Sequence, residues 1–178
     1  MLLDSDIVIC NSFWAECFKQ KKDFLAYRDC VDLLDINRGD DFRRISDTSV
    51  DFYWASAVFF RKTAENEIFF GLVKHIQDNW RHYCRIFQIN TSYFRNDYAF
   101  SIAIHIMNGY QIGDFANPLP GILYYATDKS ILWEIESNRL LFLLEKPKYV
   151  GEYTPLRTES STVHVLNKFS LNRCIDAR

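Results

Sequence analysis

The chain has 178 residues, a length that favours a single domain, and 48% of them are apolar, which excludes an intrinsically disordered protein. The formal net charge of −2 argues against a strongly basic nucleic-acid-binding protein. Residues 1–6 do not resemble a signal peptide, and no apolar run is long enough to predict a membrane-spanning helix. The five cysteines include no Cys-x-x-Cys pair, so we expect reduced thiols in a cytoplasmic protein.

The first predicted elements are two short strands and a helix. Residues 2–3 and 7–10 are brief apolar runs, which are typical of buried strands, and an Asp-Ser-Asp step separates them. Asn11 and Ser12 are suited to start a helix, which we expect over 13–27. Residues 28–49 are charged and irregular, and they predict a turn around 37–40 within a surface loop.

The middle of the chain predicts one strong strand and two helices. Residues 50–61 are apolar on both faces after Asp51, so we expect a strand that is covered on both sides. Thr63 can cap a long helix over 64–87. The apolar side chains of this helix recur at helical spacing: Phe69, Leu72, Val73, Ile76, Trp80, Tyr83 and Phe87. A third helix is predicted over 96–108, with Gly109 as its stop signal.

The last part of the chain predicts short strands near residues 110–112, 122–125, 131–135, 139–144 and 163–166, with a polar loop over 145–162. No internal repeat and no break in composition marks a second domain. The sequence therefore predicts one α/β domain over 1–178, built on a mixed sheet with flanking helices.

Asp4 and Asp6 interrupt an apolar run at the point where a strand gives way to a turn. Two carboxylates one residue apart can present oxygens to a hard divalent cation, which would neutralise a diphosphate leaving group. The other interpretation is an exposed turn, because such pairs are frequent by chance. Two unpaired acids would cost several kcal/mol if buried, so they should either lie at an edge or bind something.

Other polar residues allow two interpretations each. His164 lies in an apolar alternation, where a histidine is commonly structural. Asp97 in a helix's first turn is explained by the helix dipole alone. His75, Asp78 and His82 share one helical face that could hold a metal, but solvent exposure explains the face better.

Four segments, in order, resemble landmarks of glycosyltransferases with the GT-A fold. Residues 2–8, Leu-Leu-Asp-Ser-Asp-Ile-Val, resemble the D-x-D strand of that family. Residues 54–62 resemble the strand after the acceptor loop, residues 93–101 resemble the acidic helix start that follows it, and residues 163–168 resemble the carboxyl-terminal segment whose histidine completes the metal site. The second segment lacks the family's Asn-Ser-Gly, and the third has Asn96-Asp97 in place of two flanking acids.

The resemblance implies a metal-dependent transfer of a sugar from a nucleotide-sugar donor to a hydroxyl acceptor. Asp4, Asp6 and His164 would hold Mn²⁺ or Mg²⁺ against the diphosphate of the donor. Lys168 would stabilise the negative charge of the departing diphosphate, although it can also be an ordinary exposed lysine.

The same resemblance assigns residues to the sugar and acceptor side of the site. Trp54 and Ser56 would line that side, and Asp97 would act as the base for the acceptor hydroxyl in an inverting enzyme, or would position it in a retaining one.

In the GT-A fold a nucleotide-binding half precedes the D-x-D, whereas three residues precede it here. We therefore expect the acceptor-side, carboxyl-side part of such an enzyme, active only when an upstream nucleotide-binding segment completes it. The alternative is a non-catalytic α/β binding or assembly module that forms a homo-oligomer, or pairs with another chain, through an exposed sheet edge. A metal-dependent phosphotransfer enzyme or nuclease ranks lower, since no third clustered carboxylate is evident.

Overall fold

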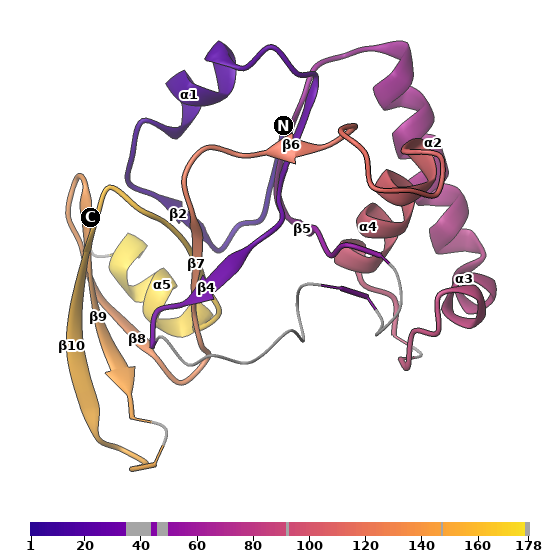
Figure 1. Cartoon of the computed structure of the whole chain (residues 1–178). Coiled ribbons are helices and arrows are strands. Elements are labelled where there is room, and N and C mark those ends of the chain that lie inside the picture. Colours follow the sequence, from indigo (N-terminus) through magenta and orange to yellow (C-terminus); the bar gives the residue numbers. More distant parts are fainter. Residues whose placement is uncertain (35–43, 46–49, 92, 147, 177–178) are drawn as a thin grey trace. The chain divides into compact units, whose positions relative to one another are not determined.

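The computed structural model describes residues 1–34, 44–45, 50–91, 93–146 and 148–176 (Figure 1). The chain is an α/β protein with mixed sheets, as the sequence predicts at this level. It divides into two compact units. The first unit comprises residues 1–3, 20–29 and 38–119, and the second unit comprises residues 4–19, 30–37 and 120–178.

The sheet of the first unit has β5 (Trp54–Phe60) as an inner strand. The strand order is β1 (Leu2–Leu3), β5, β3 (Phe24–Tyr27) and β6 (Asn117–Pro118). Strand β5 is antiparallel to both of its neighbours, and β3 and β6 are parallel. Most of β5 is buried on both faces, which confirms the prediction of a covered strand, although the strand is shorter than 50–61.

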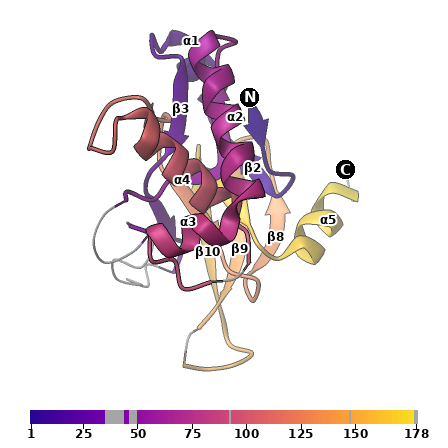
Figure 2. The same cartoon turned by 90° about the vertical axis from the view of Figure 1, so that its right-hand side faces the viewer.

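The predicted helix over 64–87 is two helices, α2 (Ala64–Asp78) and α3 (Trp80–Ile86), as Figure 2 shows. The side chain of Thr63 caps α2 by accepting a hydrogen bond from the Asn66 N–H at 3.2 Å. The helix breaks at Asn79, which has a φ of −115° and a ψ of 29°, and whose side-chain amide and backbone N–H both donate to the His75 carbonyl, at 2.9 Å and 3.0 Å. The apolar stripe packs in the core of the first unit, as predicted.

Helix α4 (Asn96–Met107) matches the third predicted helix and ends at a left-handed turn. Gly109 has a φ of 71°, and the Tyr110 N–H donates to the His105 carbonyl at 2.9 Å, which closes the helix in a Schellman motif. Tyr110 itself has a φ of 62°, so it continues this turn. The predicted strand over 110–112 is therefore wrong.

The second unit contains a mixed sheet and an antiparallel sheet. The mixed sheet has the order β2 (Ile7–Ile9), β11 (Thr162–Val165), β7 (Leu123–Ala126) and β4 (Cys30–Asp32). The antiparallel sheet has the order β10 (Tyr153–Glu159), β9 (Arg139–Glu145) and β8 (Ile131–Ile135). Helices α1 (Phe13–Lys19) and α5 (Lys168–Asp176) complete this unit.

Three further expectations need correction. The helix predicted over 13–27 ends at Lys19, and residues 24–27 form β3, because all four of its side chains are buried in a sheet. The loop predicted over 145–162 contains the edge strand β10. Its residues are mostly exposed and polar and include Pro155, so its sequence does not show the apolar pattern of a strand. The loop predicted over 28–49 contains β4, and the turn expected at 37–40 lies outside the described residues.

No helix within the described ranges is long and apolar enough to cross a membrane.

Candidate metal centre

The Asp-Ser-Asp step forms a tight turn before β2 in the second unit. The Ile7 N–H donates to the Asp4 carbonyl at 3.2 Å, which closes the turn. Asp4 is exposed, whereas Asp6 is only 6% exposed. The alternative interpretation of an exposed turn therefore holds for Asp4 but not for Asp6. The Asp6 carboxylate is buried, so its charge must be balanced by its surroundings.

Strand β11 brings His164 to this turn. Strands β11 and β2 are antiparallel, His164 pairs with Ile7, and the Val165 N–H donates to the Asp6 carbonyl at 2.8 Å. Side chains alternate along a strand, so His164 lies on the face opposite to Val163 and Val165, which are fully buried in the core of the second unit. The alternation Val-His-Val therefore directs the imidazole to the face that carries the turn.

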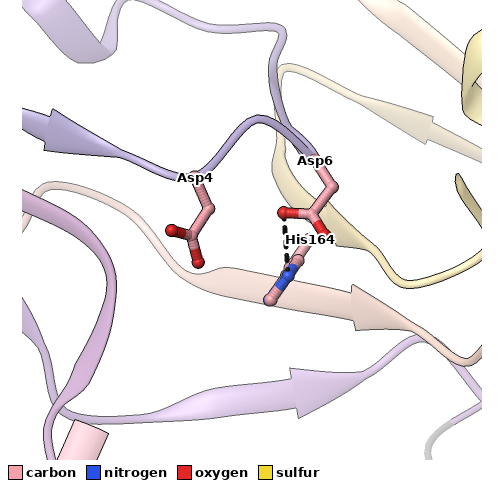
Figure 3. A group of neighbouring side chains, drawn as sticks. All are labelled: Asp4, Asp6 and His164. Atoms are coloured by element: carbon pink, nitrogen blue, oxygen red, sulfur yellow. Dashed lines mark ion pairs between the residues drawn. The ribbon is translucent and has the colours of Figure 1, made fainter. Parts of the chain in front are cut away.

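The three side chains converge, as Figure 3 shows. Asp4, Asp6 and His164 each offer one ligand atom, and these atoms all lie within 4.8 Å of one another. The imidazole Nε2 of His164 is 3.2 Å from Oδ1 of Asp6. Residues from opposite ends of the chain, which the sequence analysis assigned to one metal site, are thus neighbours in space.

This donor set suits a divalent cation. Two ligands of one ion, each about 2.2 Å from it, are at most about 4.4 Å apart, so atoms within 4.8 Å need only small side-chain rotations to share an ion. Two carboxylates and one imidazole are ligands that Mn²⁺ and Mg²⁺ accept, with the nitrogen favouring Mn²⁺. The group also leaves coordination positions for a ligand from outside the protein, because three side chains do not fill the six positions such ions favour.

Lys168 is the first residue of α5 and belongs to the same group. Its Nζ lies 3.4 Å from Oδ2 of Asp6, while its side chain is 67% exposed. Asn167 caps α5 by accepting a hydrogen bond from the Ser170 N–H at 3.1 Å. The helix was missed in the sequence, although Asn167 followed by apolar Leu171 and Cys174 at helical spacing was a signal for it.

Lys168 brings a positive charge to the buried carboxylate of Asp6. The exposed ammonium of Lys168 can meanwhile turn toward an anionic ligand, because a lysine side chain is flexible.

The other predicted residues lie in the first unit. Trp54 and Ser56 are 8% and 4% exposed in β5. Oδ1 of Asp97 accepts a hydrogen bond from the Ala55 N–H at 2.9 Å, and Oδ2 accepts one from Arg95 at 2.8 Å. Asp97 thereby ties the start of α4 to β5, and its role as a base stays a prediction.

The helical face with His75, Asp78 and His82 forms no such group among the described residues. Asp78 pairs with Lys74 at 2.8 Å, and Nδ1 of His75 contacts the Asn79 side chain at 3.4 Å. All three side chains are exposed, which confirms the preferred interpretation of a solvated face.

No family model, no curated protein and no solved structure matches the chain. The interpretation of its chemistry therefore depends on the residues of the metal centre.

Proposed function

We propose that the chain is a divalent-metal-dependent glycosyltransferase, or the carboxyl-side part of one, which transfers a sugar from a nucleotide-sugar donor to a hydroxyl group of an acceptor. The observation that carries the proposal is the convergence of Asp4, Asp6 and His164 within 4.8 Å, with Lys168 beside Asp6. These residues come from two segments that resemble the D-x-D strand and the carboxyl-terminal histidine segment of GT-A enzymes.

Each residue has a role that follows from its chemistry. Asp4, Asp6 and His164 would hold Mn²⁺ or Mg²⁺, and the bound cation would offset the charge that builds up on the departing diphosphate. Lys168 would move its ammonium from Asp6 to a diphosphate oxygen, adding a charged hydrogen bond where negative charge develops. Burial of Asp6 keeps the carboxylate in place, so little reorganisation accompanies the reaction.

On the acceptor side, Asp97 would be the base or positioning group, and Trp54 and Ser56 would line the sugar pocket. These roles are supported by the resemblance of residues 54–62 and 93–101 to two segments of GT-A glycosyltransferases, which occur in the same order in that family.

The alternative, an assembly module that pairs through a sheet edge, has less support. Strand β10 stands at the end of its sheet, where an added strand would pair. It carries Pro155, Arg157 and Glu159, and proline and charged residues are what natural proteins use to prevent pairing at an edge.

Binding of uridine and guanosine diphosphates, measured by calorimetry with and without Mn²⁺, tests the proposal. We expect one diphosphate to bind in Mn²⁺ and at least tenfold more weakly in EDTA, because the cation bridges protein and diphosphate. Asp6→Asn should remove this dependence, whereas Asp128→Asn, which changes an exposed acid of the same unit, should not. Binding that is equal in Mn²⁺ and EDTA, or equal for Asp6→Asn and the original chain, would overturn the proposal.

Transfer itself needs the donor's base and ribose to be held. Release of sugar from nucleotide sugars in Mn²⁺ is the second test, and Asp6→Asn should abolish any such release. Release that survives Asp6→Asn would contradict the assigned role of the metal centre.

A further inference from the structure

A pocket of about 590 Å³ lies beside α3 in the first unit, and it belongs to none of the residues assigned above. It is lined by Trp80, Arg81, Cys84, Arg85, Ile89, Asn90, Thr91 and Tyr93. Its volume lies within the range of small-molecule sites, roughly 300–1,000 Å³.

The turn after α3 folds back and forms one wall of this pocket. Gln88 has a φ of 53°, a left-handed conformation that a residue other than glycine rarely adopts, and the Ile89 N–H donates to the Cys84 carbonyl at 2.9 Å. The thiol of Cys84 in turn donates to the Thr91 carbonyl at 3.4 Å. These bonds hold residues 89–91 against the helix.

The charge of the lining is entirely positive. Arg81 and Arg85 lie one helical turn apart, and neither guanidinium forms an ion pair or hydrogen bond with another described residue. No aspartate or glutamate lines the pocket. Burial raises the pKa of the Cys84 thiol above its ordinary value, so this side chain stays neutral near pH 7. Two cations side by side repel each other unless an anion joins them.

Two aromatic residues add further recognition. Trp80 is a buried residue of the pocket lining, so its indole N–H signal reports on changes in the pocket. Tyr93 is 81% exposed, so its ring is available to pack against a sugar or a base. Asn90 and Thr91 supply polar side chains between them.

We propose that this pocket binds a phosphate monoester, with the phosphate held between Arg81 and Arg85 and the organic part packed against Tyr93. Guanidinium groups match phosphate geometry and bind it through charged hydrogen bonds, and both of these exposed groups are available for such bonds. The pocket shares no residue with the metal centre, so this proposal does not depend on the function proposed for that centre.

The indole N–H signals of the four tryptophans in ¹⁵N-labelled protein test the proposal. Ribose 5-phosphate should shift the Trp80 signal, which Trp80→Phe identifies, while ribose at the same concentration leaves it in place. Arg81→Gln and Arg85→Gln should each weaken binding by about threefold or more, since each removes one charged hydrogen bond. Lys21→Gln removes one exposed charge of the same unit outside the pocket and should leave binding unchanged.

Comparing uridine 5′-monophosphate with ribose 5-phosphate identifies the organic part. Tighter binding of the nucleotide, lost in Tyr93→Ala, identifies a nucleotide site, and equal binding identifies a sugar phosphate site. The proposal would be overturned by a Trp80 signal that does not move with either phosphate or that moves equally with ribose. Binding in both arginine variants as tight as in the original chain would also overturn it.

Discussion

The imidazole Nε2 of His164 lies 3.2 Å from Oδ1 of Asp6. The two residues are far apart in the sequence and meet because β11 runs antiparallel to β2, with the Val165 N–H bonded to the Asp6 carbonyl. The backbone pairing of two buried strands therefore fixes the distance between the side chains. This rigidity makes the metal centre testable by substitution, since a conservative change at either residue should leave the strands paired.

Asp6→Asn should strongly weaken Mn²⁺ binding while the protein stays folded. The amide keeps the size of the carboxylate but loses the charge that attracts the cation and balances Lys168. Electron paramagnetic resonance of free Mn²⁺ measures the affinity, which we expect to fall by at least about tenfold. Asp128→Asn should bind as the original chain does, and unaltered binding by Asp6→Asn would remove Asp6 from the site.

Lys168→Gln should separate cation binding from diphosphate binding. Removing the ammonium takes a positive charge away from Asp6, so Mn²⁺ affinity should stay the same or rise. Affinity for a diphosphate in the presence of Mn²⁺ should fall by about tenfold, because a charged hydrogen bond is lost. Calorimetry with Mn²⁺ alone, and then with uridine diphosphate in Mn²⁺, makes the comparison. A parallel loss of both affinities would indicate that Lys168 supports the structure of the site instead.

The sequence predicted the parts of the fold that depend on local patterns. The stripe from Phe69 to Phe87 and the stop at Gly109 follow from helical spacing and from the backbone freedom of glycine. The break at Asn79 was missed because the apolar side chains keep their helical spacing on both sides of it. Strand β3 was predicted as helix because four consecutive buried residues fit either structure until their neighbours are known.

In the metal centre, too, the sequence indicated what is local and did not indicate what depends on long-range pairing. The two carboxylates stood out in the sequence because they interrupt an apolar run, but nothing local to His164 points to them. Their meeting depends on the pairing of β2 with β11, which is long-range, and the family resemblance supplied that link. The attachment of Asp97 to the Ala55 N–H was not foreseen, since it depends on how α4 lies against β5.

Lowering the pH from about 8 to about 6 should weaken Mn²⁺ binding, because an imidazole must be deprotonated to bind a metal ion. His164→Gln removes the imidazole and keeps a neutral polar side chain. Its affinity should be lower at the higher pH and should depend less on pH than that of the original chain. Resonance titrations at both pH values measure this. An equal ratio of the two dissociation constants in both proteins would exclude His164 as a ligand.

Asp97→Ala should destabilise the first unit. The carboxylate satisfies the Ala55 N–H and Arg95, and losing it leaves a partly buried donor unpaired, at a cost of about 1–3 kcal/mol in the free energy of unfolding. Asp97→Asn should cost less, because the amide oxygen can still accept from Ala55. Arg95→Gln, which breaks only the more exposed contact, should cost at most about 1 kcal/mol. Urea unfolding measures the stability of the three variants. An Asp97→Ala variant as stable as the original chain would show that the contacts of Asp97 do not stabilise the first unit.

Cys17 should make the protein more sensitive to alkali. Burial in α1, with Glu16 nearby, raises the pKa of this thiol from an ordinary 9.0 to about 11 in the folded protein. As the pH rises, the unfolded chain therefore releases its thiol proton before the folded chain does. The stability of the folded state is unaffected by this thiol below pH 9 and falls between pH 9 and about 11. The loss is on the order of 3 kcal/mol once the thiol is ionised in both states, from 1.36 kcal/mol for each pKa unit. Cys17→Ala creates a small cavity whose cost does not depend on pH, so urea unfolding at about pH 8 and about pH 10.5 should show a smaller drop for the variant than for the original chain. Equal drops in both proteins would mean that the thiol does not resist ionisation in the folded state.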